Sequence, residues 1–485
     1  MKFIGRRHEL ALLDKLYQRQ GAQFLVLYGR RRIGKTALIQ EWISSRVDSQ
    51  ISPDDILYWM ATQTSTTNQL REFSQTVLLH MSPNTPVSAT FSYDSWETAL
   101  AQVAEYAARR RFVLILDEFT YVMQANTEVP SLIQRLWDHQ LKTSNLFLIL
   151  TGSLAGIIQR TILEYQAPLY GRATSKLKLQ PLSFGTLSLF FPNMPTEQRV
   201  AVYAITGGIP AYLELFDDNL NLLNNLREHF ITPTNLMLND AVFLLREQLD
   251  EPRNYMALLE SIAAGNHKLA DVAKMAGLDR SAATKYLAVL SELGYVKRTV
   301  PATVRHPEKS RQGRFVITDA YLRFYFRFLR PYLGDIERGR INRVISLLRD
   351  HLTDFIGTHT FEELCREWLD ISTDEGTLPF FPDRVGSHWS RTSQVDVLGI
   401  NWRTKEILLG ECKWGRQSVE RKVVDTLVDK TAKVLPSKDA WTVYYAFFVR
   451  TPLTSDARTR AQTIGAMVVD VEQIERDMLA WVESQ

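Results

Sequence analysis

The chain has 485 residues, of which 45% are hydrophobic and 23% are charged, and its formal net charge is +3. This length predicts two to four domains, and the composition is that of globular proteins, not of disordered or fibrous ones. The small net charge excludes a general electrostatic attraction to nucleic acid, so any such affinity has to come from local basic patches. The apolar runs are too short to span a bilayer, a charged segment stands where a signal peptide would lie, and the two cysteines, Cys365 and Cys412, form no disulfide or zinc framework. We therefore expect a cytoplasmic protein without a membrane partner.

The first motif in chain order is GRRRIGKT, which matches the phosphate-binding pattern G-x-x-x-x-G-K-[ST] at every fixed position. The apolar run FLVLY before it predicts a buried strand, and ALIQEWI after it predicts a helix, which is the context that the motif requires. Lys35 is expected to reach the β and γ phosphates of ATP, and Thr36 to help hold Mg²⁺. Backbone N–H groups at the helix N-terminus are expected to hold the phosphates. The predicted ATP site comprises Gly29, Arg30, Arg31, Arg32, Ile33, Gly34, Lys35 and Thr36.

A second strand signal, FVLILDE, ends in two acids and predicts a buried parallel strand that reaches the ligand edge of an α/β sheet. Asp117 is expected to coordinate Mg²⁺ through water, and Glu118 to polarise the water that attacks ATP. A third apolar run, LFLILTGS, ends in the hydroxyls of Thr151 and Ser153. These hydroxyls resemble the polar sensor of AAA+ ATPases, although a simple strand-to-turn transition has the same appearance.

Residues 1 to about 215 resemble the archaeal-type ATPases, a branch of the AAA+ and STAND P-loop proteins. The resemblance rests on FIGRRHELALL, YGRRRIGKT, LILDE, LILTGS, LYGRATSKLKLQPLSF and ITGGIPAYL. It implies that Ile4, Gly5 and Arg6 lie near the adenine base. It also implies that Gly208 and Pro210 belong to an element of a helical lid that contacts the nucleotide.

The same resemblance implies a role for Arg172 in sensing the γ-phosphate, either within its own chain or from a neighbouring copy in a homo-oligomer. The alternative for Arg172 is a surface arginine in a loop. In the family, a winged helix and a nuclease-like tail often follow the ATPase, so the resemblance extends over nearly the whole chain.

The segment from Tyr255 to Thr318 has the pattern of a winged helix-turn-helix. Its second long helix is expected to turn Ala283 and Leu287 inward and to present a polar face to nucleic acid. A basic, flexible hairpin follows as the wing. The expected nucleic-acid contacts are Arg280, Ser281, Thr284 and Lys285 on the helix and Arg305, Lys309, Arg311 and Arg314 on the wing. DNA is the expected partner and RNA the alternative, and a domain that contacts only proteins has the same pattern.

The aromatic run AYLRFYFRFLRPYL, which follows the wing, is interpreted as a packed helix between domains with its arginines directed outward. The alternative for this run is a surface on which nucleic-acid bases stack.

The tail carries QVDVLGINWRTKEILLGECKW, which predicts two strands joined by a polar turn. Because side chains alternate along a strand, Glu411 and Lys413 share one face, and Asp396 meets Glu411 across the hairpin. Two carboxylates suit Mg²⁺, and the lysine would orient a water and offset charge on a phosphate. The pattern resembles the PD-(D/E)XK nucleases, in their restriction-endonuclease-like form, with Val395 where the family has proline. The alternative is a hairpin whose polar residues face solvent.

Glu362 in the upstream segment FEELCREWL borders its apolar stripe and is the candidate for a third acidic ligand at the catalytic site, while a solvated helix flank is the alternative. The sequence therefore predicts a multidomain α/β protein. Its expected parts are a P-loop ATPase core (1–185), a helical lid (186–250), a winged helix-turn-helix (251–320), a helical linker (321–350) and a nuclease-like domain (351–485).

The expected function is an ATP-binding and ATP-hydrolysing switch that controls a Mg²⁺-dependent nuclease acting on DNA, with ATP and Mg²⁺ as cofactors. The rival is a regulatory ATPase whose winged helix and tail bind without cleaving. The sequence leaves open whether RNA, or invading DNA in host defence, is the target.

Overall fold

The computed structural model describes residues 3–47, 51–153, 155–232, 235, 237–249, 251–437 and 440–484. It divides into two compact units, Met1–Pro181 and Leu182–Gln485. The five-part domain division remains a prediction. No helix among the described residues has the length and apolar character needed to cross a membrane.

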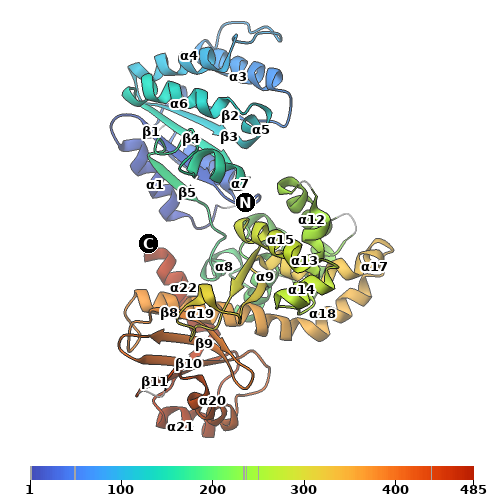
Figure 1. Ribbon diagram of the computed structural model, residues 1–485. Coiled ribbons are helices and arrows are strands. Elements are labelled where there is room, and N and C mark those ends of the chain that lie inside the picture. The colour runs from blue at the N-terminus through green and yellow to red at the C-terminus, as the bar shows by residue number, and fades with distance from the viewer. Residues whose placement is uncertain are drawn as a thin grey trace. The chain divides into compact units, whose positions relative to one another are not determined.

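The first unit is built on a parallel five-stranded sheet of order β2-β3-β4-β1-β5. Helices cover both faces of this sheet (Figure 1), so its central strands are continuous apolar runs without alternation. Strands β3 and β4 are buried along their whole length. The strands are β1 (Gln23–Tyr28), β2 (Ile56–Met60), β3 (Phe112–Asp117), β4 (Leu146–Gly152) and β5 (Ser175–Lys178). The helices are α1 (Arg7–Gln18), α2 (Lys35–Arg46), α3 (Thr66–Met81), α4 (Trp96–Arg109), α5 (Thr120–Ala125), α6 (Val129–His139) and α7 (Ala155–Ile158).

The second unit begins with short helices and continues into a helix-turn-helix. Strands β6 (Val296–Thr299) and β7 (Arg314–Ile317) pair antiparallel after it as the wing. As predicted, Ala283 and Leu287 are buried, and Leu290 on the same face is buried too. The helices are α8 (Leu187–Phe190), α9 (Thr196–Thr206), α10 (Pro210–Leu213), α11 (Leu222–Asn225), α12 (Met237–Gln248), α13 (Pro252–Ala263), α14 (Leu269–Met275) and α15 (Arg280–Glu292).

The aromatic run after the wing forms α16 (Ala320–Phe324) and a continuing helical segment, followed by α17 (Leu333–Glu337) and α18 (Ile341–Phe355). Packing is confirmed for its apolar residues, since seven large side chains are buried. They are Tyr321, Leu322, Phe324, Tyr325, Phe326, Phe328 and Leu329. The outward direction expected for its arginines is wrong for Arg323, which is 6% exposed and paired with Glu363.

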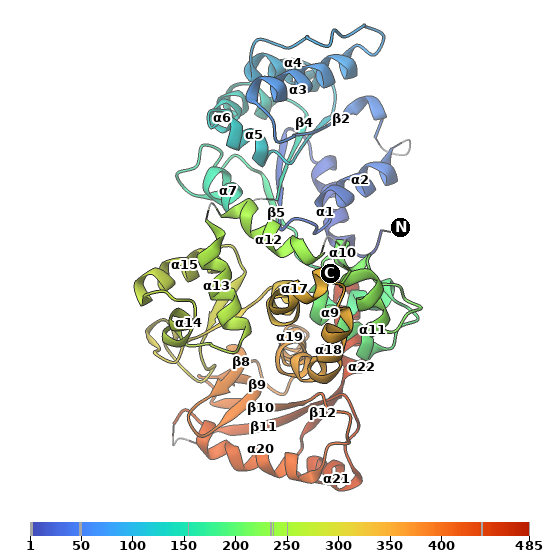
Figure 2. The same ribbon diagram turned by 90° about the vertical axis from the view of Figure 1, so that its right-hand side faces the viewer.

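The tail is a mixed five-stranded sheet of order β12-β11-β10-β9-β8 with helices beside it (Figure 2). Strands β8, β9 and β10 are antiparallel neighbours, whereas β10, β11 and β12 are parallel. The predicted hairpin is confirmed as β9 and β10. The elements are α19 (Glu362–Asp374), β8 (Arg384–Trp389), β9 (Gln394–Asn401), β10 (Glu406–Lys413), α20 (Arg421–Val434), β11 (Thr442–Val449), α21 (Ser455–Thr463), β12 (Met467–Asp470) and α22 (Val471–Ser484).

The short helices at the start of the second unit pack closely on the tail. A Cβ atom added to Gly185 would collide with the backbone nitrogen of Leu479 on α22. Because the obstacle is backbone, this packing leaves no room for a side chain at position 185.

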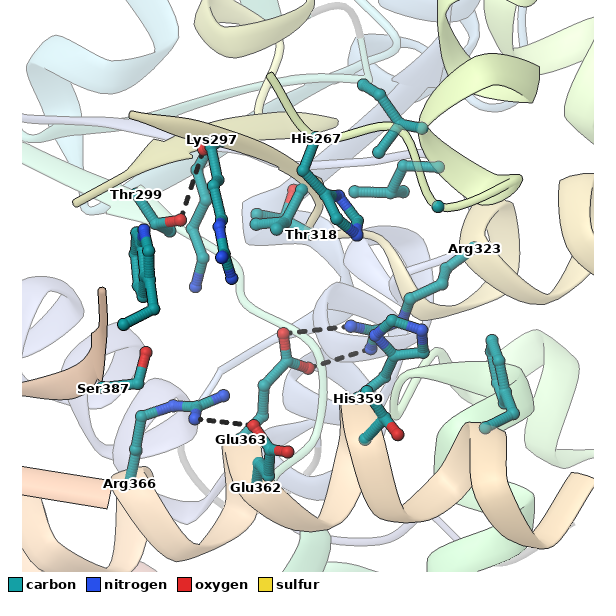
Figure 3. A pocket seen from close by; sticks show the side chains of 18 of the residues that line it. His267, Lys297, Thr299, Thr318, Arg323, His359, Glu362, Glu363, Arg366 and Ser387 are labelled. Atoms are coloured by element: carbon teal, nitrogen blue, oxygen red, sulfur yellow. Dashed lines mark hydrogen bonds and ion pairs between the residues drawn. The ribbon is translucent and has the colours of Figure 1, made fainter. Parts of the chain in front are cut away.

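The wing is docked on β8 of the tail, which corrects the expectation of a flexible hairpin. Its loop runs along β8, where Ala302 N–H donates to the Ser387 carbonyl at 2.8 Å and Trp389 Nε1–H donates to the Gln312 carbonyl at 3.3 Å. Beneath the wing, a cleft separates β6 and β7 from α19 (Figure 3). The winged helix and the tail therefore form the walls of one cleft.

Candidate functional site

The P-loop connects β1 to α2 and has the backbone that phosphate binding requires. Gly34 has φ 91° and Arg32 has φ 69°, both left-handed, so the loop turns its N–H groups toward one point. Gly29 is needed because a Cβ atom there would lie 2.7 Å from the Leu179 carbonyl oxygen. The Lys35 ammonium is buried and donates to the Gly29 and Arg30 carbonyls at 3.2 and 3.5 Å. A phosphate would replace these carbonyls as its partner.

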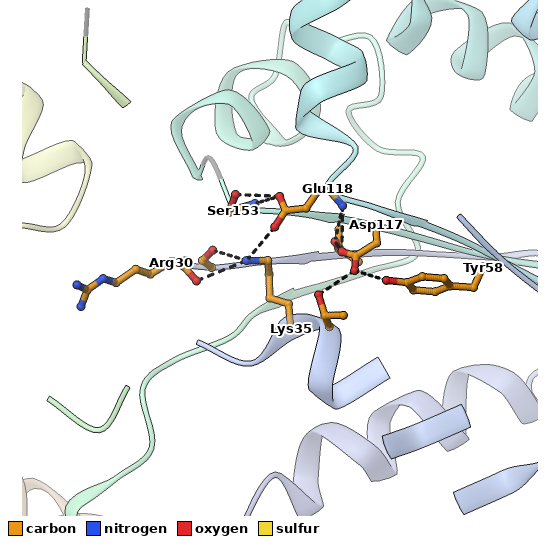
Figure 4. Close-up of polar contacts among 9 residues, drawn as sticks. Arg30, Lys35, Tyr58, Asp117, Glu118 and Ser153 are labelled. Atoms are coloured by element: carbon orange, nitrogen blue, oxygen red, sulfur yellow. Dashed lines mark hydrogen bonds and ion pairs between the residues drawn. The ribbon is translucent and has the colours of Figure 1, made fainter. Parts of the chain in front are cut away.

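Asp117 lies at the end of β3, fully buried, and collects three hydroxyl groups (Figure 4). Thr36 Oγ1 donates to its Oδ2 at 2.8 Å, Tyr58 OH donates to the same oxygen at 2.7 Å, and Thr151 Oγ1 donates to Oδ1. The predicted Mg²⁺ pair, Thr36 and Asp117, is thus in direct contact. Tyr58 was missed from the sequence. Burial, followed by the hydrogen bond to Asp117, raises the pKa of its hydroxyl, so it stays a donor.

Glu118 is held by Ser153 at the end of the neighbouring strand β4. Ser153 Oγ and N–H donate to Glu118 Oε2 at 2.8 and 3.2 Å, and the Lys35 ammonium lies 3.9 Å from Oε1. Glu118 itself has φ 49°, a strained conformation for a residue with a side chain, which turns its carboxylate away from the path of the strand. Ser153 therefore contacts the predicted catalytic acid, while Thr151 holds Asp117.

The opening segment of the chain reaches the P-loop through Arg6. Its guanidinium is buried and donates to the Ile33 carbonyl at 3.3 Å and to Glu9 Oε1 at 2.9 Å. Gly5 and Arg6 are both left-handed, with φ 74° and 63°, so the backbone turns sharply between Ile4 and the start of α1. Arg6 thus braces the loop, and the adenine contact remains a prediction.

The other predicted nucleotide contacts have partners of their own. Arg172 forms a forked ion pair with Asp138, with Nη2 and Oδ2 2.8 Å apart. Gly208 and Pro210 belong to the second unit. There, a Cβ atom at Gly208 would collide with the Leu182 carbonyl, and Pro210 begins α10. The roles of all three toward ATP stay predictions.

The acidic residues of the tail meet across β9 and β10. Residues 397 and 410 are register partners, so Asp396 and Glu411 follow on neighbouring strands. Cys412 N–H donates to Asp396 Oδ2 at 3.1 Å, and the Lys413 ammonium donates to Glu411 Oε1 at 2.8 Å. Burial, and then the charge of Glu411, raises the pKa of Asp396. The structure therefore brings together the three residues that the sequence selected.

A second lysine, Lys430 on α20, was missed. Its ammonium donates to Glu411 Oε2 at 3.1 Å, so each oxygen of Glu411 accepts from a different lysine. The sequence holds a weak signal, because Lys430 follows the buried Leu427 by three residues and therefore borders the apolar face of α20. Nothing in the local pattern indicates that this edge meets β10.

Glu362 lies at the start of α19, beside this group. Arg366 Nη1 donates both to Glu362 Oε2 at 3.3 Å and to the Asp396 backbone carbonyl at 2.7 Å. Burial raises the pKa of Glu362 to about 8, and the charge of Asp396 adds to the rise. Glu362 is therefore not the solvated helix flank of the alternative interpretation, and it is linked to Asp396 through one arginine.

Among the described residues, no three His, Cys, Asp or Glu side chains are grouped to hold a metal. Mg²⁺ commonly takes one or two carboxylates from a protein, keeps several waters and shares substrate phosphates. Asp396 and Glu411 supply such a pair of oxygen donors in the tail. Thr36 and Asp117 supply the hydroxyl and carboxylate expected beside a nucleotide.

The predicted nucleic-acid residues of α15, namely Arg280, Ser281, Thr284 and Lys285, are all exposed. On the wing, the three loop residues Arg305, Lys309 and Arg311 are exposed too. Arg314 differs, because its guanidinium lies 4.6 Å from the centre of the Trp389 ring, and burial lowers its pKa. It lines the cleft beneath the wing.

Sequence comparisons identify three regions of the chain. Residues 3–216 match a family described as an ATPase domain predominantly from Archaea. Residues 254–299 match the IclR helix-turn-helix domain, and residues 325–424 match a family described as archaeal and bacterial proteins of unknown function. The protein MJECL04 of Methanocaldococcus jannaschii, itself uncharacterized, is 31% identical over 412 residues, which cover 85% of this chain and 87% of MJECL04. The chain belongs to the family of MJECL04.

A shorter likeness links this chain to an uncharacterized ATP-binding protein of the same organism, MJ0423, which is 39% identical over 44 residues, 9% of this chain and 75% of MJ0423. Among solved structures, the Walker-type ATPase PABY2304 of Pyrococcus abyssi is 17% identical, with a TM-score of 0.49 over 67% of this chain and 96% of the other. The Aeropyrum pernix ORC1 protein, solved in complex with DNA, is 13% identical, with a TM-score of 0.37 over 69% and 95%. TM-scores below 0.5 do not establish a common fold.

The candidate residues of the chain fall into different matched regions. The ATPase match contains the whole P-loop, Asp117, Glu118 and Ser153. The region of unknown function contains Glu362, Asp396, Glu411 and Lys413 but ends before Lys430. The helix-turn-helix match contains the exposed residues of α15 and ends before the wing loop.

Proposed function

We propose that this protein is an ATP-binding and ATP-hydrolysing switch that controls a Mg²⁺-dependent nuclease acting on DNA. The observation that carries the proposal is the contact of Glu411 with Lys413 beside Asp396, in a chain that also holds a complete P-loop ATPase site. The same chain contains an ATPase domain and a helix-turn-helix domain. This combination supports a tail that acts on nucleic acid under the control of ATP.

In the ATPase site, each residue receives a role from its contacts. Lys35 would exchange the Gly29 and Arg30 carbonyls for the β and γ phosphates, because a phosphate offers a stronger acceptor. Thr36 and Asp117 would hold Mg²⁺, which shields phosphate charge when bound. Glu118, oriented by Ser153, would take a proton from the attacking water.

In the tail, Asp396 and Glu411 would hold Mg²⁺, which stabilises charge on a scissile phosphate. Lys413 would orient the attacking water and bind a phosphate oxygen once released from Glu411. Arg366 would keep the backbone of Asp396 and the carboxylate of Glu362 in place. Glu362 then acts at the edge of this group.

Coupling would run through the second unit. The helices that the sequence assigns to the lid share this unit with the tail, and α22 of the tail contacts α9 of the lid region. A lid that moves with nucleotide state would therefore carry the tail with it. The winged helix would hold DNA close to Asp396.

The proposal is tested by incubating the purified protein with plasmid DNA and, separately, with RNA, in Mg²⁺ or Mn²⁺, with and without ATP. Cleavage of DNA that depends on metal and changes with ATP is expected. Absence of cleavage of either nucleic acid under all conditions, with no metal bound by the tail, would refute the nuclease assignment.

A second candidate is a regulatory ATPase whose tail binds without cleaving. One observation favours it, namely that both oxygens of Glu411 already accept from lysines, which a cation would have to displace. Metal titration separates the two candidates. The nuclease binds Mn²⁺ at the tail in a way that Glu411→Ala abolishes, whereas the regulatory protein binds none there.

A further inference from the structure

The cleft beneath the wing has a volume of about 970 Å³ and lies wholly within the second unit. One wall is the wing, with Lys297, Thr299 and Arg314, and the opposite wall is α19 with Glu363 and Arg366 (Figure 3). Its volume is at the upper end of the range for pockets that enclose small molecules. A few nucleotides of one strand fit such a space, whereas a duplex does not.

Three basic side chains of the cleft are available to a ligand. Arg323 and Arg366 are neutralised by Glu363 and Glu362, at 2.9 and 3.3 Å. Lys297, Arg314 and Arg327 have no described carboxylate within ion-pairing distance, and Lys297 and Arg327 are exposed. Lysine and arginine side chains without a carboxylate partner attract phosphate groups.

A buried histidine of the cleft lacks one hydrogen bond. His388 on β8 is 7% exposed, and its Nδ1 contacts Thr303 Oγ1 at 2.8 Å. Its Nε2 atom has no hydrogen-bond partner within the described part of the chain. Because a buried polar atom without a hydrogen-bond partner is unfavourable, a ligand group that bonded to Nε2 would remove this cost.

The cleft also reaches the acidic residues of the tail. Glu362 lies in its wall, and Arg366 connects Glu362 to the Asp396 backbone. The lining is mixed in charge, with Glu367 and Asp370 on α19 facing the same space as the basic residues. A nucleic-acid strand suits this mixture, since its phosphates bind cations while its exocyclic amino groups donate to carboxylates.

We propose that the cleft binds a single nucleic-acid strand, with its phosphates on Lys297, Arg314 and Arg327 and its sugars or bases on His388 and Thr299. Strand binding is independent of cleavage. Only the further step, that the strand is directed to Asp396 and Glu411 as the substrate of the tail, rests on the proposed nuclease function. The exposed face of α15 would hold a duplex, so the protein would have two surfaces for two forms of nucleic acid.

The test measures fluorescence anisotropy of labelled oligonucleotides of about 16 nucleotides, the upper end of the site size of single-strand grooves. Single-stranded DNA, single-stranded RNA and duplex DNA are compared in EDTA, so cleavage plays no part. The variant Lys297→Ala/Arg327→Ala is expected to weaken single-strand binding roughly tenfold and to lower the log–log salt slope by about 0.7 for each phosphate that is no longer neutralised. Arg280→Ala/Lys285→Ala is expected to weaken duplex binding alone.

The matched control is Lys422→Ala/Lys433→Ala, which removes two exposed lysines of α20 outside the cleft and is expected to bind both forms like wild type. Unchanged single-strand affinity in Lys297→Ala/Arg327→Ala, with an unchanged melting temperature, would overturn the proposal. Equal losses of affinity for single strand and duplex would also overturn it.

The strand-binding proposal and the nuclease proposal can fail separately. If no cleavage is seen but Lys297→Ala/Arg327→Ala loses strand binding, strand binding by the cleft is supported and the nuclease assignment is wrong. If cleavage occurs but the cleft variant binds single strands normally, the nuclease assignment is supported and strand binding by the cleft is wrong. Comparing the affinities for single-stranded DNA and single-stranded RNA shows which of the two the cleft binds.

Discussion

Arg199 and Glu475 lie 276 residues apart in the chain and form a buried ion pair, with Arg199 Nε and Glu475 Oε1 2.5 Å apart. Thr196 Oγ1 donates to the same carboxylate at 3.0 Å. Arg199 and Thr196 lie on α9 and Glu475 lies on α22, so this pair fastens the lid region to the last helix of the tail. The ion pair is one of the contacts that join these two helices within one compact unit.

Removal of Glu475 should destabilise this unit. Glu475→Ala leaves the Arg199 charge buried without its partner, for which a loss of about 3 to 5 kcal/mol in the free energy of unfolding is expected. Replacing both residues with apolar ones, as in Arg199→Met/Glu475→Leu, should cost less. The control Glu472→Ala, at an exposed position of α22, should cost less than about 1 kcal/mol. Urea unfolding measures all three, and a milder loss for Glu475→Ala than for the double variant would contradict the expectation.

The ATPase site predicts two separable defects. Lys35→Ala should lower ATP affinity and abolish turnover, because the phosphates lose their cationic partner. Glu118→Gln should keep ATP binding while slowing hydrolysis by about 10²- to 10⁴-fold, because it removes only the base. Binding of a fluorescent ATP analogue and release of phosphate measure the two effects. Wild-type ATP affinity in Lys35→Ala would be hard to reconcile with the P-loop assignment.

The tail predicts loss of cleavage without loss of ATP hydrolysis. Asp396→Ala and Glu411→Ala should abolish both cleavage and Mn²⁺ binding at the tail. Lys413→Ala should retain the metal but slow the chemical step, and Glu362→Ala should show the smaller loss of an outer position. Glu420→Ala, at an exposed position before α20, is the control and should cleave normally. Single-turnover cleavage measures the chemical step, and isothermal titration with Mn²⁺ measures metal binding. Full cleavage activity in Asp396→Ala would rule out Asp396 as a metal ligand of the nuclease.

The wing predicts a salt-dependent contribution to duplex binding. Neutralising the exposed residues Arg305, Lys309 and Arg311 should weaken duplex affinity and lower the log–log salt slope by about 0.9 for each phosphate that the wing no longer binds. Arg314 is omitted because it lines the cleft, where it is assigned to the single strand and not to the duplex. Titrations at several salt concentrations measure the slope. If affinity and slope stay unchanged while binding to a protein partner disappears, the domain is a protein-binding module.

The buried imidazole of His359 should contribute stability at neutral pH that is lost in mild acid. Burial lowers the pKa of this imidazole from 6.5 to about 4, and the charge of Arg323 contributes, while Glu363 opposes the shift. Between pH 6.5 and pH 4, His359 is protonated in the unfolded chain but stays neutral in the folded one. Its contribution to the free energy of unfolding is therefore complete above pH 6.5 and is lost as the pH falls toward 4. The loss is at most about 3 kcal/mol, since one pKa unit corresponds to about 1.4 kcal/mol. The midpoint of urea unfolding should fall more between pH 7 and pH 5 in wild type than in His359→Gln, and equal falls would contradict this assignment.

The sequence by itself determined what depends on neighbours in the chain. The P-loop is eight consecutive residues between a strand and a helix, so its pattern fixes both its backbone and the place of Lys35. The alternation of β10 put Glu411 and Lys413 on one face, and the short turn fixed the register that brings Asp396 beside them. The inward face of α15 followed from helical spacing in the same way.

The tertiary structure alone decided what joins distant segments. Tyr58 reaches Asp117 only because β2 pairs with β3, and Lys430 reaches Glu411 only because α20 packs beside β10. The wing was predicted as a flexible hairpin because the sequence of its basic loop gives no indication that it contacts the edge of β8. The physical reason is common to these cases. A side chain's local pattern determines the face it occupies, whereas its partner depends on which other element covers that face, and that is settled by the packing of the whole unit.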